Sequence, residues 1–294
     1  MDTARYRAFL TAAETGSIKN AADIMGYTSS AVSQLIQALE KELGVTLLHR
    51  GKKGVMLTIE GEQLIQPVRE LMLKENQIYQ IAGDIRGTIY GTINIAAYHS
   101  IVRAWMPEIV SGFQKLYPQV RINLYEGTQV DIIERLKSGK AHIAVFNDSA
   151  MSESHDWIPL AEDPMMAVLP EGHPMAEKKK FPVEKFEGER FLMPEHGWDF
   201  DVLEVLSKAK VTPDVYLSTF DSAIILEMVA KGLGVSIVNG MSIPGNEKNV
   251  RVMPLDPPSS IEMGIAVMSF KRATPAVKKF VEFMQEKILS MQAK

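Results

Sequence analysis

The 294-residue chain contains no cysteine. Disulfides, thiol nucleophiles and thiolate metal sites are therefore excluded, and the composition fits a reducing compartment. No stretch approaches the ~20 apolar residues that a membrane-spanning helix needs. The N-terminus also lacks the apolar run of a secretory signal. We therefore expect a cytoplasmic protein with no membrane partner.

Motifs of catalysis and cofactor binding are missing as well. The six histidines show no close metal-ligand spacing, and no GxxxxGK[ST] phosphate-binding loop occurs. GMSIPG at 240–245 has one residue too many for a nucleophile elbow. GLG at 232–234 ends a predicted helix, whereas a dinucleotide fingerprint opens one. We expect no enzyme activity, no metal and no cofactor.

Net charge is small and unevenly distributed. The formal net charge is -4, which by itself argues mildly against a nucleic-acid partner. Residues 1–58 carry seven Lys or Arg and five Asp or Glu, which leaves the acidic excess to the rest of the chain. The charge distribution thus favours the N-terminal segment as the partner of an anion.

Residues 17–44 predict two helices joined by a tight turn. Ser17 can cap the first helix and Gly26 can end it. Thr28 can cap the second helix, which Gly44 ends. This arrangement is typical of a helix-turn-helix unit, whose second helix enters the DNA major groove. An ordinary helical hairpin with a polar surface is the alternative.

The second helix has two contrasting sides. Its apolar side consists of Val32, Leu35, Ile36, Leu39 and Leu43. Short polar side chains dominate the other side and its cap, and we expect them to read or position on DNA: Thr28, Ser29, Ser30, Ser33, Gln34 and Gln37. Gln can pair with adenine, and Ser can donate to phosphate. Glu40 is assigned to the same outward side.

The segment after these helices predicts a basic hairpin. VTLLHRGKKGVMLT contains two short strands around a tip bounded by Gly51 and Gly54. Arg50, Lys52 and Lys53 belong to this tip. Following a helix-turn-helix, such a hairpin is expected to contact phosphates or the minor groove as a wing. A solvated turn is the alternative.

Together these residues resemble the N-terminal module of the LysR-type transcriptional regulators. The resemblance spans about 5–61 and is carried by Ser17-Ile18, Asn20-Ala21-Ala22, Ser29-Ser30-Ala31-Val32-Ser33, Leu39-Glu40, Leu43-Gly44-Val45, Leu57-Thr58 and Gly61. Leu48 stands where the family usually has Phe, a core exchange. The resemblance implies that the second helix reads DNA and that the wing grips its backbone.

A long helix is predicted from Ile59 to Ile85, with Thr58 as its cap. Its heptad positions are Leu64, Val68, Leu71, Glu75, Ile78, Ala82 and Ile85. Such a seam favours pairing of two chains, although Glu75 interrupts it and Pro67 should bend the helix. The family resemblance implies the same dimer, which would place two reading helices about 34 Å apart. Packing of this helix on its own chain is the alternative.

From residue 87 onwards, strands and helices alternate. This pattern predicts an α/β fold with a parallel sheet, helices on both faces and two lobes around a cleft. A looser resemblance to the family's effector domain, itself similar to periplasmic binding proteins, covers this part of the chain. It is carried by Leu116-Tyr117-Pro118, Leu136-Lys137-Ser138-Gly139, Gly172-His173-Pro174 and Gly232-Leu233-Gly234-Val235.

The expected domains are a winged helix-turn-helix at 1–58, a linker helix at 59–86 and an effector domain at 87–294. Within the last, lobe I comprises 87–162 and 266–294, and lobe II comprises 163–265. Strand-to-helix junctions supply the expected effector contacts: Ser100, Thr128, Asn147, His196, Thr219 and Phe220. Helix starts there favour an anionic effector, whereas Asp221 would oppose one.

The sequence thus predicts a regulator that binds double-stranded DNA under the control of a small-molecule effector. We expect a homodimer, and the family resemblance favours a further homotetramer. Two other classes stay open at this level. A small-molecule binding or transport protein would explain the lobes but leave the N-terminal module without a role. An α/β enzyme would need a catalytic set that the sequence does not offer.

Overall fold

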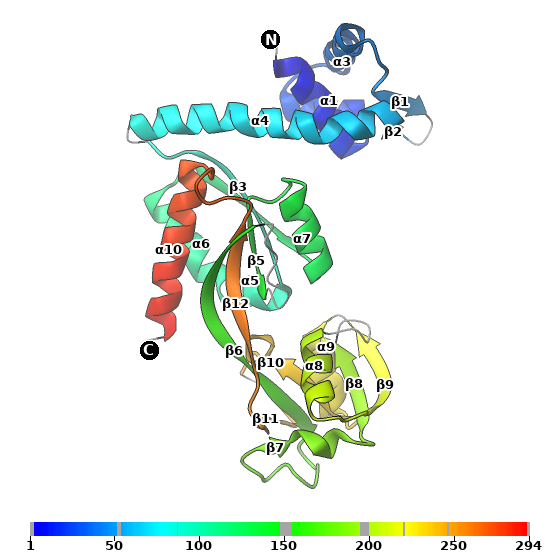
Figure 1. Ribbon diagram of the computed structural model, residues 1–294, viewed down its shortest axis with the longest axis vertical. Helices are drawn as coiled ribbons and strands as arrows, with labels where there is room; N and C mark the ends of the chain where they lie inside the picture. Colours follow the sequence, from blue (N-terminus) through cyan, green and yellow to red (C-terminus); the bar gives the residue numbers. More distant parts are fainter. Residues whose placement is uncertain are drawn as a thin grey trace. The chain divides into compact units, whose positions relative to one another are not determined.

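The computed structural model describes residues 3–51, 54–86, 88–147, 155–194, 200–219, 221–245 and 247–292. The chain divides into two compact units (Figure 1). The first comprises residues 1–91 with 274–276, and the second comprises the remaining residues of 92–294. Within the described ranges, no helix is long and apolar enough to cross a membrane.

The N-terminal unit is a winged helix-turn-helix followed by a long helix. Its elements are α1 (Thr3–Thr15), α2 (Ile18–Met25), α3 (Ser29–Leu43), β1 (Leu48–Gly51), β2 (Gly54–Leu57) and α4 (Ile59–Ile85). The Ser17 side chain accepts from the Asn20 N–H at 3.2 Å, and that of Thr28 accepts from the Ala31 N–H at 3.2 Å. Gly26 and Gly44 end their helices in the left-handed conformation. The predicted caps and stops of both helices are confirmed.

The apolar side of α3 packs into the core of this unit. Val32, Ile36 and Leu39 are fully buried, together with residues of α1 and α2. Leu43, which the helical wheel assigned to this side, is 39% exposed. Leu47, which follows the turn at Gly44, is fully buried in the same core.

Lobe I of the second unit is built on one end of a mixed sheet. Its strands are β4 (Val120–Glu126), β3 (Gly91–Ala97), β5 (Ile143–Asn147) and β12 (Ser260–Val267), in that order across the sheet. Its helices are α5 (His99–Ala104), α6 (Met106–Leu116), α7 (Gln129–Lys137) and α10 (Pro275–Gln292). The Phe113 ring of α6 packs edge-on against Phe280 of α10, with ring centroids 5.0 Å apart.

The alternating pattern predicts one helix over SIVRAWMPEIVSGFQKLYP at 100–118, but this segment is divided in two. The segment from about residue 100 to 118 forms α5 and α6, with Trp105 between them. Pro107 lies in the first turn of α6, where its missing N–H and its ring are tolerated. The break therefore coincides with a residue that a continuous helix would accommodate poorly.

The expected all-parallel sheet is wrong. β3 and β5 are parallel, but β12 runs antiparallel to β5 and to the 15-residue strand β6 (Asp156–Pro170). β6 and β12 carry the chain between the lobes, as Figure 1 shows. Since they pair with each other in opposite directions, they join the lobes through an antiparallel ribbon. Pairing of β12 with β5 begins at Met263, so β12 enters the lobe I sheet before residue 266.

Lobe II surrounds the far half of β6. Its elements are β7 (Phe181–Pro182), the 3-10 helix η1 (Val183–Phe186), β8 (Arg190–Pro194), α8 (Phe200–Lys208), β9 (Asp214–Thr219), α9 (Ser222–Ala230), β10 (Ser236–Asn239), the 3-10 helix η3 (Gly240–Ser242) and β11 (Val250–Asp256). Phe191 and Met193 of β8 belong to the core cluster that holds α8, and Leu192 belongs to the one that holds α9. The two helices therefore cover opposite faces of β8.

Candidate DNA-binding surface and effector cleft

The polar side of α3 is open on its own unit. Ser29, Ser30, Gln34 and Gln37 are exposed, and Ser33 is half-buried. Thr28 is also exposed, although its hydroxyl caps the helix. The first turn of α3, which is described throughout, contains no acidic residue. Its N-terminal amides and partial positive charge are thus free of competition from an adjacent carboxylate.

The predicted wing exists as the antiparallel pair β1 and β2. Leu48 pairs with Leu57 and Gly51 pairs with Gly54. The Val55 N–H donates to the Gly16 carbonyl at 2.9 Å, which anchors the hairpin to the turn between α1 and α2. A Cβ on Gly54 would lie 2.5 Å from the same carbonyl oxygen, and the φ of Gly54 is +107°. Glycine is therefore required at this point.

The structure describes the basic residues of the wing tip only in part. Lys52 and Lys53 lie outside the described residues. Arg50 belongs to β1, and its side chain is likewise outside the description. Their contacts with DNA stay a prediction from the sequence.

Glu40 has a role that the sequence did not suggest. Its Oε1 accepts from the Leu47 N–H at 2.7 Å and from the Leu48 N–H at 3.2 Å. The sequence pattern predicts that Glu40 lies on the outward side of the helix, but the side chain is half-buried. Since β1 starts at Leu48, this carboxylate ties the recognition helix to the wing.

The first half of the α4 seam packs on its own chain. Val68 is 4% exposed, and Leu64 and Leu71 pack partly against the same helix-turn-helix core. Glu75 accepts from the Thr3 hydroxyl at 2.6 Å and from Arg7 Nη2 at 2.8 Å. The Thr3 hydrogen bond lowers the pKa of Glu75. The first half of α4 packs within its own unit, so the apolar seam predicted from residue 64 is not continuously available for a dimer.

The second half of α4 has a different character. Ile78 is 67% exposed and Ile85 is 82% exposed, and Ala82 is exposed between them. Ile81, which neighbours these positions on the helix, is also exposed. These residues form an apolar stripe that their own unit leaves uncovered.

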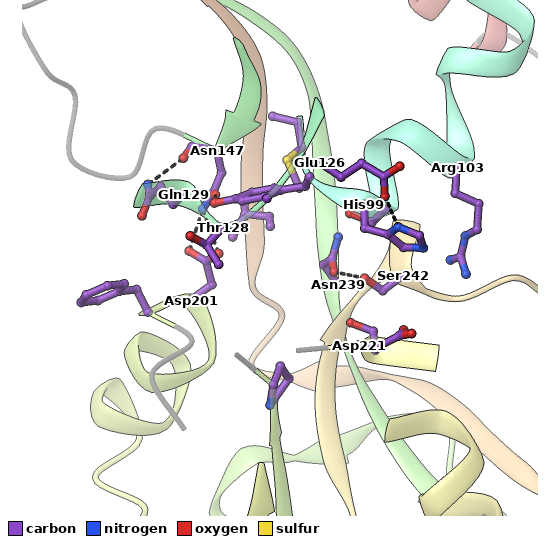
Figure 2. Close-up of a pocket in the computed structure, with 18 of the residues that line it drawn as sticks. His99, Arg103, Glu126, Thr128, Gln129, Asn147, Asp201, Asp221, Asn239 and Ser242 are labelled. Atoms are coloured by element: carbon purple, nitrogen blue, oxygen red, sulfur yellow. Dashed lines mark hydrogen bonds and ion pairs between the residues drawn. The ribbon is translucent and has the colours of Figure 1, made fainter. Parts of the chain in front are cut away.

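The second unit contains a cavity of about 470 Å³ between its lobes (Figure 2). Lobe I lines it with residues from the ends of β3, β4 and β5 and the helices that follow; lobe II lines it with residues around the starts of α8 and α9 and from η3. Its volume lies in the range typical of small-molecule sites. The cavity is where the sequence predicted an effector cleft.

Some of the expected contact residues line this cavity. They are Ser100, Thr128 and Asn147. Thr219 pairs with Pro194 at the end of β9, and the lining there consists of Pro194 and Asp221 rather than Thr219. His196 and Phe220 lie outside the described residues. The lining also includes Asp201 and Asn239, which the sequence did not single out because their elements look like ordinary capped helices and strands.

A chain of hydrogen bonds crosses the cavity from one lobe to the other. The Tyr98 hydroxyl donates to Asn147 Oδ1 at 2.6 Å, and Asn147 Nδ2 donates to both carboxylate oxygens of Asp201 at 2.8 Å. Gln129 Nε2 donates to the Asn147 carbonyl at 3.1 Å. Asn147 is 3% exposed. This residue, expected to contact effector, thus also bridges lobe I to the first turn of α8.

A second bridge joins the lobes through Arg103. Its Nη2 donates to the Met241 carbonyl of η3 at 2.9 Å. The Met241 N–H in turn donates to Asp163 Oδ1 at 3.1 Å, and Asn239 Nδ2 donates to Asp163 Oδ2 at 2.6 Å. Asp163 is a buried residue of the crossover strand β6, and burial raises its pKa. The bridge therefore ends on the strand that connects the lobes.

Carboxylates of the chain itself cap the helix starts at the cavity. Asp131 Oδ2 accepts from the Thr128 N–H at 3.0 Å and from the Thr128 hydroxyl at 2.7 Å. These bonds lower the pKa of Asp131, the hydroxyl bond most strongly. Asp221 caps α9 and accepts from the Ala223 N–H at 2.8 Å. His99 Nδ1, also in the lining, is paired with Glu126 (Figure 2).

An exposed polar recognition helix beside a wing, and a separate two-lobed unit with an internal cleft, define a DNA-binding regulator with a sensory domain. Comparison with known proteins gives the family. Residues 3–62 match the bacterial regulatory helix-turn-helix protein, lysR family, and residues 86–288 match the LysR substrate binding domain. The chain belongs to the LysR family. It is a LysR-type DNA-binding transcriptional regulator with an effector-binding domain, and not an enzyme.

Relatives in sequence are regulators along almost the same length. The chain is 29% identical over 289 residues to the uncharacterized HTH-type transcriptional regulator YvbU of Bacillus subtilis, with 97% of this chain and 98% of YvbU covered. It is 25% identical over 245 residues to the dual regulator OxyR of Escherichia coli, covering 83% of this chain and 80% of OxyR.

Solved structures share the fold. Full-length OxyR C199D from Pseudomonas aeruginosa aligns with a TM-score of 0.78 at 22% identity, covering 98% of this chain and 94% of that one. Full-length CbnR in complex with its target DNA aligns with a TM-score of 0.66 at 18% identity, covering 97% and 99%. The mixed α/β effector unit behind a helix-turn-helix is therefore a fold already seen in LysR-type regulators.

Proposed function

We propose that α3 reads DNA in the major groove, that the wing holds the phosphate backbone, and that the inter-lobe cleft binds the effector that controls the protein. The observation that carries the first part is the open polar side of α3, whose short uncharged side chains allow close approach to base edges. Gln34 and Gln37 are its base-reading candidates, and Ser29, Ser30 and Ser33 its positioning candidates. We further infer a cytoplasmic location, where bacterial DNA lies.

Two substitutions distinguish base recognition by α3 from phosphate binding by the wing. Gln37→Ala is expected to relax sequence preference, at a cost of about 1–3 kcal/mol on the preferred site. Lys52→Ala is expected to weaken binding to all duplexes and to reduce the salt slope by about one. The measurement is fluorescence anisotropy on specific and random duplexes over a salt series.

A matched control is Lys74→Ala, which removes the same charge from an exposed position of α4. It is expected to leave both the preference and the salt slope unchanged. Equal effects of Gln37→Ala and Lys52→Ala on specific and random DNA would contradict the assignment of roles.

We infer that the chain dimerises through the second half of α4. Support comes from the exposed stripe of Ile78, Ile81, Ala82 and Ile85, since isolated apolar helices in water favour burial against a partner. A homodimer would hold two reading helices at neighbouring half-sites.

A homotetramer requires a further contact, for which lobe I offers a surface. β4 is the end strand of its sheet, and the groove beside it is lined by Val102, Met106, Val110 and Leu124. We propose that a second effector domain of the same protein occupies this edge, because unpaired strand edges with apolar neighbours favour self-association.

The effector acts on the lobes. A small molecule can shift the arrangement only through different affinities for two states of the protein. The Asn147–Asp201 and Arg103–Met241 bridges are contacts that one state has and another can lose. Helix starts at the cleft favoured an anionic effector on sequence grounds, but the carboxylates around the cleft compete with that choice.

A further inference from the structure

We propose that the effector carries a positively charged amino group, which the carboxylates of the cleft receive. The proposal rests on the proposed function, because it assumes that the inter-lobe cavity is the effector site. It concerns the charge of the ligand, which membership in the family does not fix for this chain.

Carboxylates outnumber cations in the described lining. The acidic residues are Glu126, Asp131, Asp201 and Asp221, and Arg103 is the lone Lys or Arg among the described lining residues. Opposite charge within a few ångströms favours a charged ligand, and like charge disfavours it. A cation is therefore the ligand charge that this lining favours.

Three of the helix starts at the cavity already carry a carboxylate of the chain, whereas α5 has no side-chain cap at Tyr98. Asp131 occupies the first turn of α7, and Asp221 caps α9. Asp201 lies in the first turn of α8. A helix N-terminus attracts negative charge within its first turn, so these three carboxylates take the place that an effector carboxylate would occupy.

The cation of the lining also has a task. Arg103 Nη2 donates to the Met241 carbonyl across the cleft, so part of this guanidinium is already used in an inter-lobe bond. Both oxygens of Asp201 accept from the neutral amide of Asn147, which brings no positive charge to the carboxylate. An ammonium group supplies three donors and the matching charge.

Aromatic side chains fit the same ligand. Tyr98 and Phe200 line the cavity, and Phe200 precedes Asp201 on α8 with 65% of its surface exposed. The face of an aromatic ring attracts a cation, and it does so beside a carboxylate without competing for hydrogen bonds. The cavity volume of about 470 Å³ suits a small organic amine rather than a polymer.

The first experiment measures the sign of the potential without a known ligand. The full-length protein is labelled at its methionine methyl groups, and relaxation is compared between a cationic aminomethyl nitroxide and its anionic carboxyl analogue at low salt. Met165 and Met263 line the cavity and report on it. We expect stronger relaxation of both methyls by the cationic probe. Equal relaxation, or stronger relaxation by the anionic probe, would overturn the proposal.

Charge-neutral variants supply the control. Glu126→Gln with Asp221→Asn keeps side-chain shape and a capping oxygen while removing two charges. The stronger relaxation of the Met165 and Met263 methyl groups by the cationic probe than by the anionic one should shrink. The corresponding difference at Met56 of the wing should not change. An unchanged difference in relaxation at the two cleft methyl groups would show that these carboxylates do not cause the difference, and would contradict the proposal.

The second experiment uses matched ligands. Calorimetry on the full-length protein compares 1,5-diaminopentane with glutarate, and phenethylamine with 3-phenylpropanoate. The amine of each pair is expected to bind about tenfold or more tightly, and Asp201→Asn to weaken amine binding by about tenfold. Tighter binding of the carboxylates would sink the inference. DNA binding, measured on the same preparation, distinguishes failure of this proposal from failure of the proposed function. A protein that binds DNA and responds to carboxylates would still have the proposed function. A protein that binds no duplex would not have it.

Discussion

Substitution of Glu40 tests whether the recognition helix and the wing act as one rigid reader. Glu40→Ala removes the oxygen that accepts from the Leu47 and Leu48 backbone N–H groups. Leu47 and Leu48 are both buried, so solvent does not readily replace the lost acceptor. The substitution therefore leaves two donors without their partner at the junction between α3 and β1.

The expected magnitude follows from the two bonds. A hydrogen bond to a charged group, lost so that its donor stays unsatisfied, costs about 1–3 kcal/mol. The Leu47 bond is short at 2.7 Å and the Leu48 bond is longer at 3.2 Å, so the second contributes less. Together they predict a local loss of about 2–4 kcal/mol. Glu40→Gln keeps one neutral acceptor oxygen and should cost about 1 kcal/mol.

Hydrogen exchange of the backbone is the direct assay, because it resolves local opening in a chain with two units. A loss of 2 kcal/mol corresponds to about 30-fold faster exchange at Leu47 and Leu48. Anisotropy titrations should also show weaker DNA binding with an unchanged order of preference among duplexes, since no base-reading side chain is removed.

Glu42→Ala is the matched control on the same helix. Glu42 forms an exposed ion pair with Arg5 at 2.9 Å, and exposed pairs contribute at most about 1 kcal/mol. The reasoning is refuted if Glu40→Ala leaves exchange at Leu47 and Leu48 unchanged, or if Glu42→Ala perturbs them equally.

Two further outcomes are expected. Ile78→Asp should shift the protein towards monomers in sedimentation velocity, whereas Ile59→Asp, also at an exposed isoleucine of α4, should not; identical behaviour would argue against the second half of α4 as the interface. His142 accepts the Asn94 N–H at its Nδ1, and burial lowers its pKa below the ordinary 6.5. The unfolded chain therefore takes up a proton before the folded one does, and stability falls as the pH drops below 6.5 towards the folded pKa. His142→Gln should flatten that slope in denaturant titrations; an unchanged slope would assign it elsewhere.

Local signals in the sequence predicted the N-terminal module well because its determinants are local. Ser17, Thr28 and Gly44 act within three or four residues of themselves, and the structure confirms each. Of the long strand β6, the sequence pattern predicts only the part MMAVL at 165–169. Pro159 and Pro164 interrupt its first part, and such residues normally demote a strand. Its pairing with β12 comes from residues about 100 positions away, which no local pattern records.

The sequence did not predict the role of a residue correctly where the same side chain fits two different packing arrangements. Val68 fits a heptad seam and also fits the core of its own unit, and periodicity does not choose between them. Glu40 is charged and falls on the polar side of the helical wheel, so the sequence predicts a solvent-exposed side chain. Its actual partners are backbone amides beyond the helix end, which become visible only when the chain has turned back.

The arrangement of the cleft gives the proposed amine a route to control the lobes. Figure 2 shows the Asn147–Asp201 bridge and Arg103 on different sides of the cavity. An ammonium group at Asp201 competes with the Asn147 amide for the same oxygens, whereas the Arg103 bond to Met241 is left intact. The amine would then bind with different affinity to lobe arrangements that keep and that lose the Asn147 bridge, and such a difference is what a shift between them requires. Loss of the Asn147 bridge without ligand, as in Asn147→Ala, should therefore reduce the change in DNA binding that an amine produces, while Arg103→Ala should alter DNA binding in the absence of any amine.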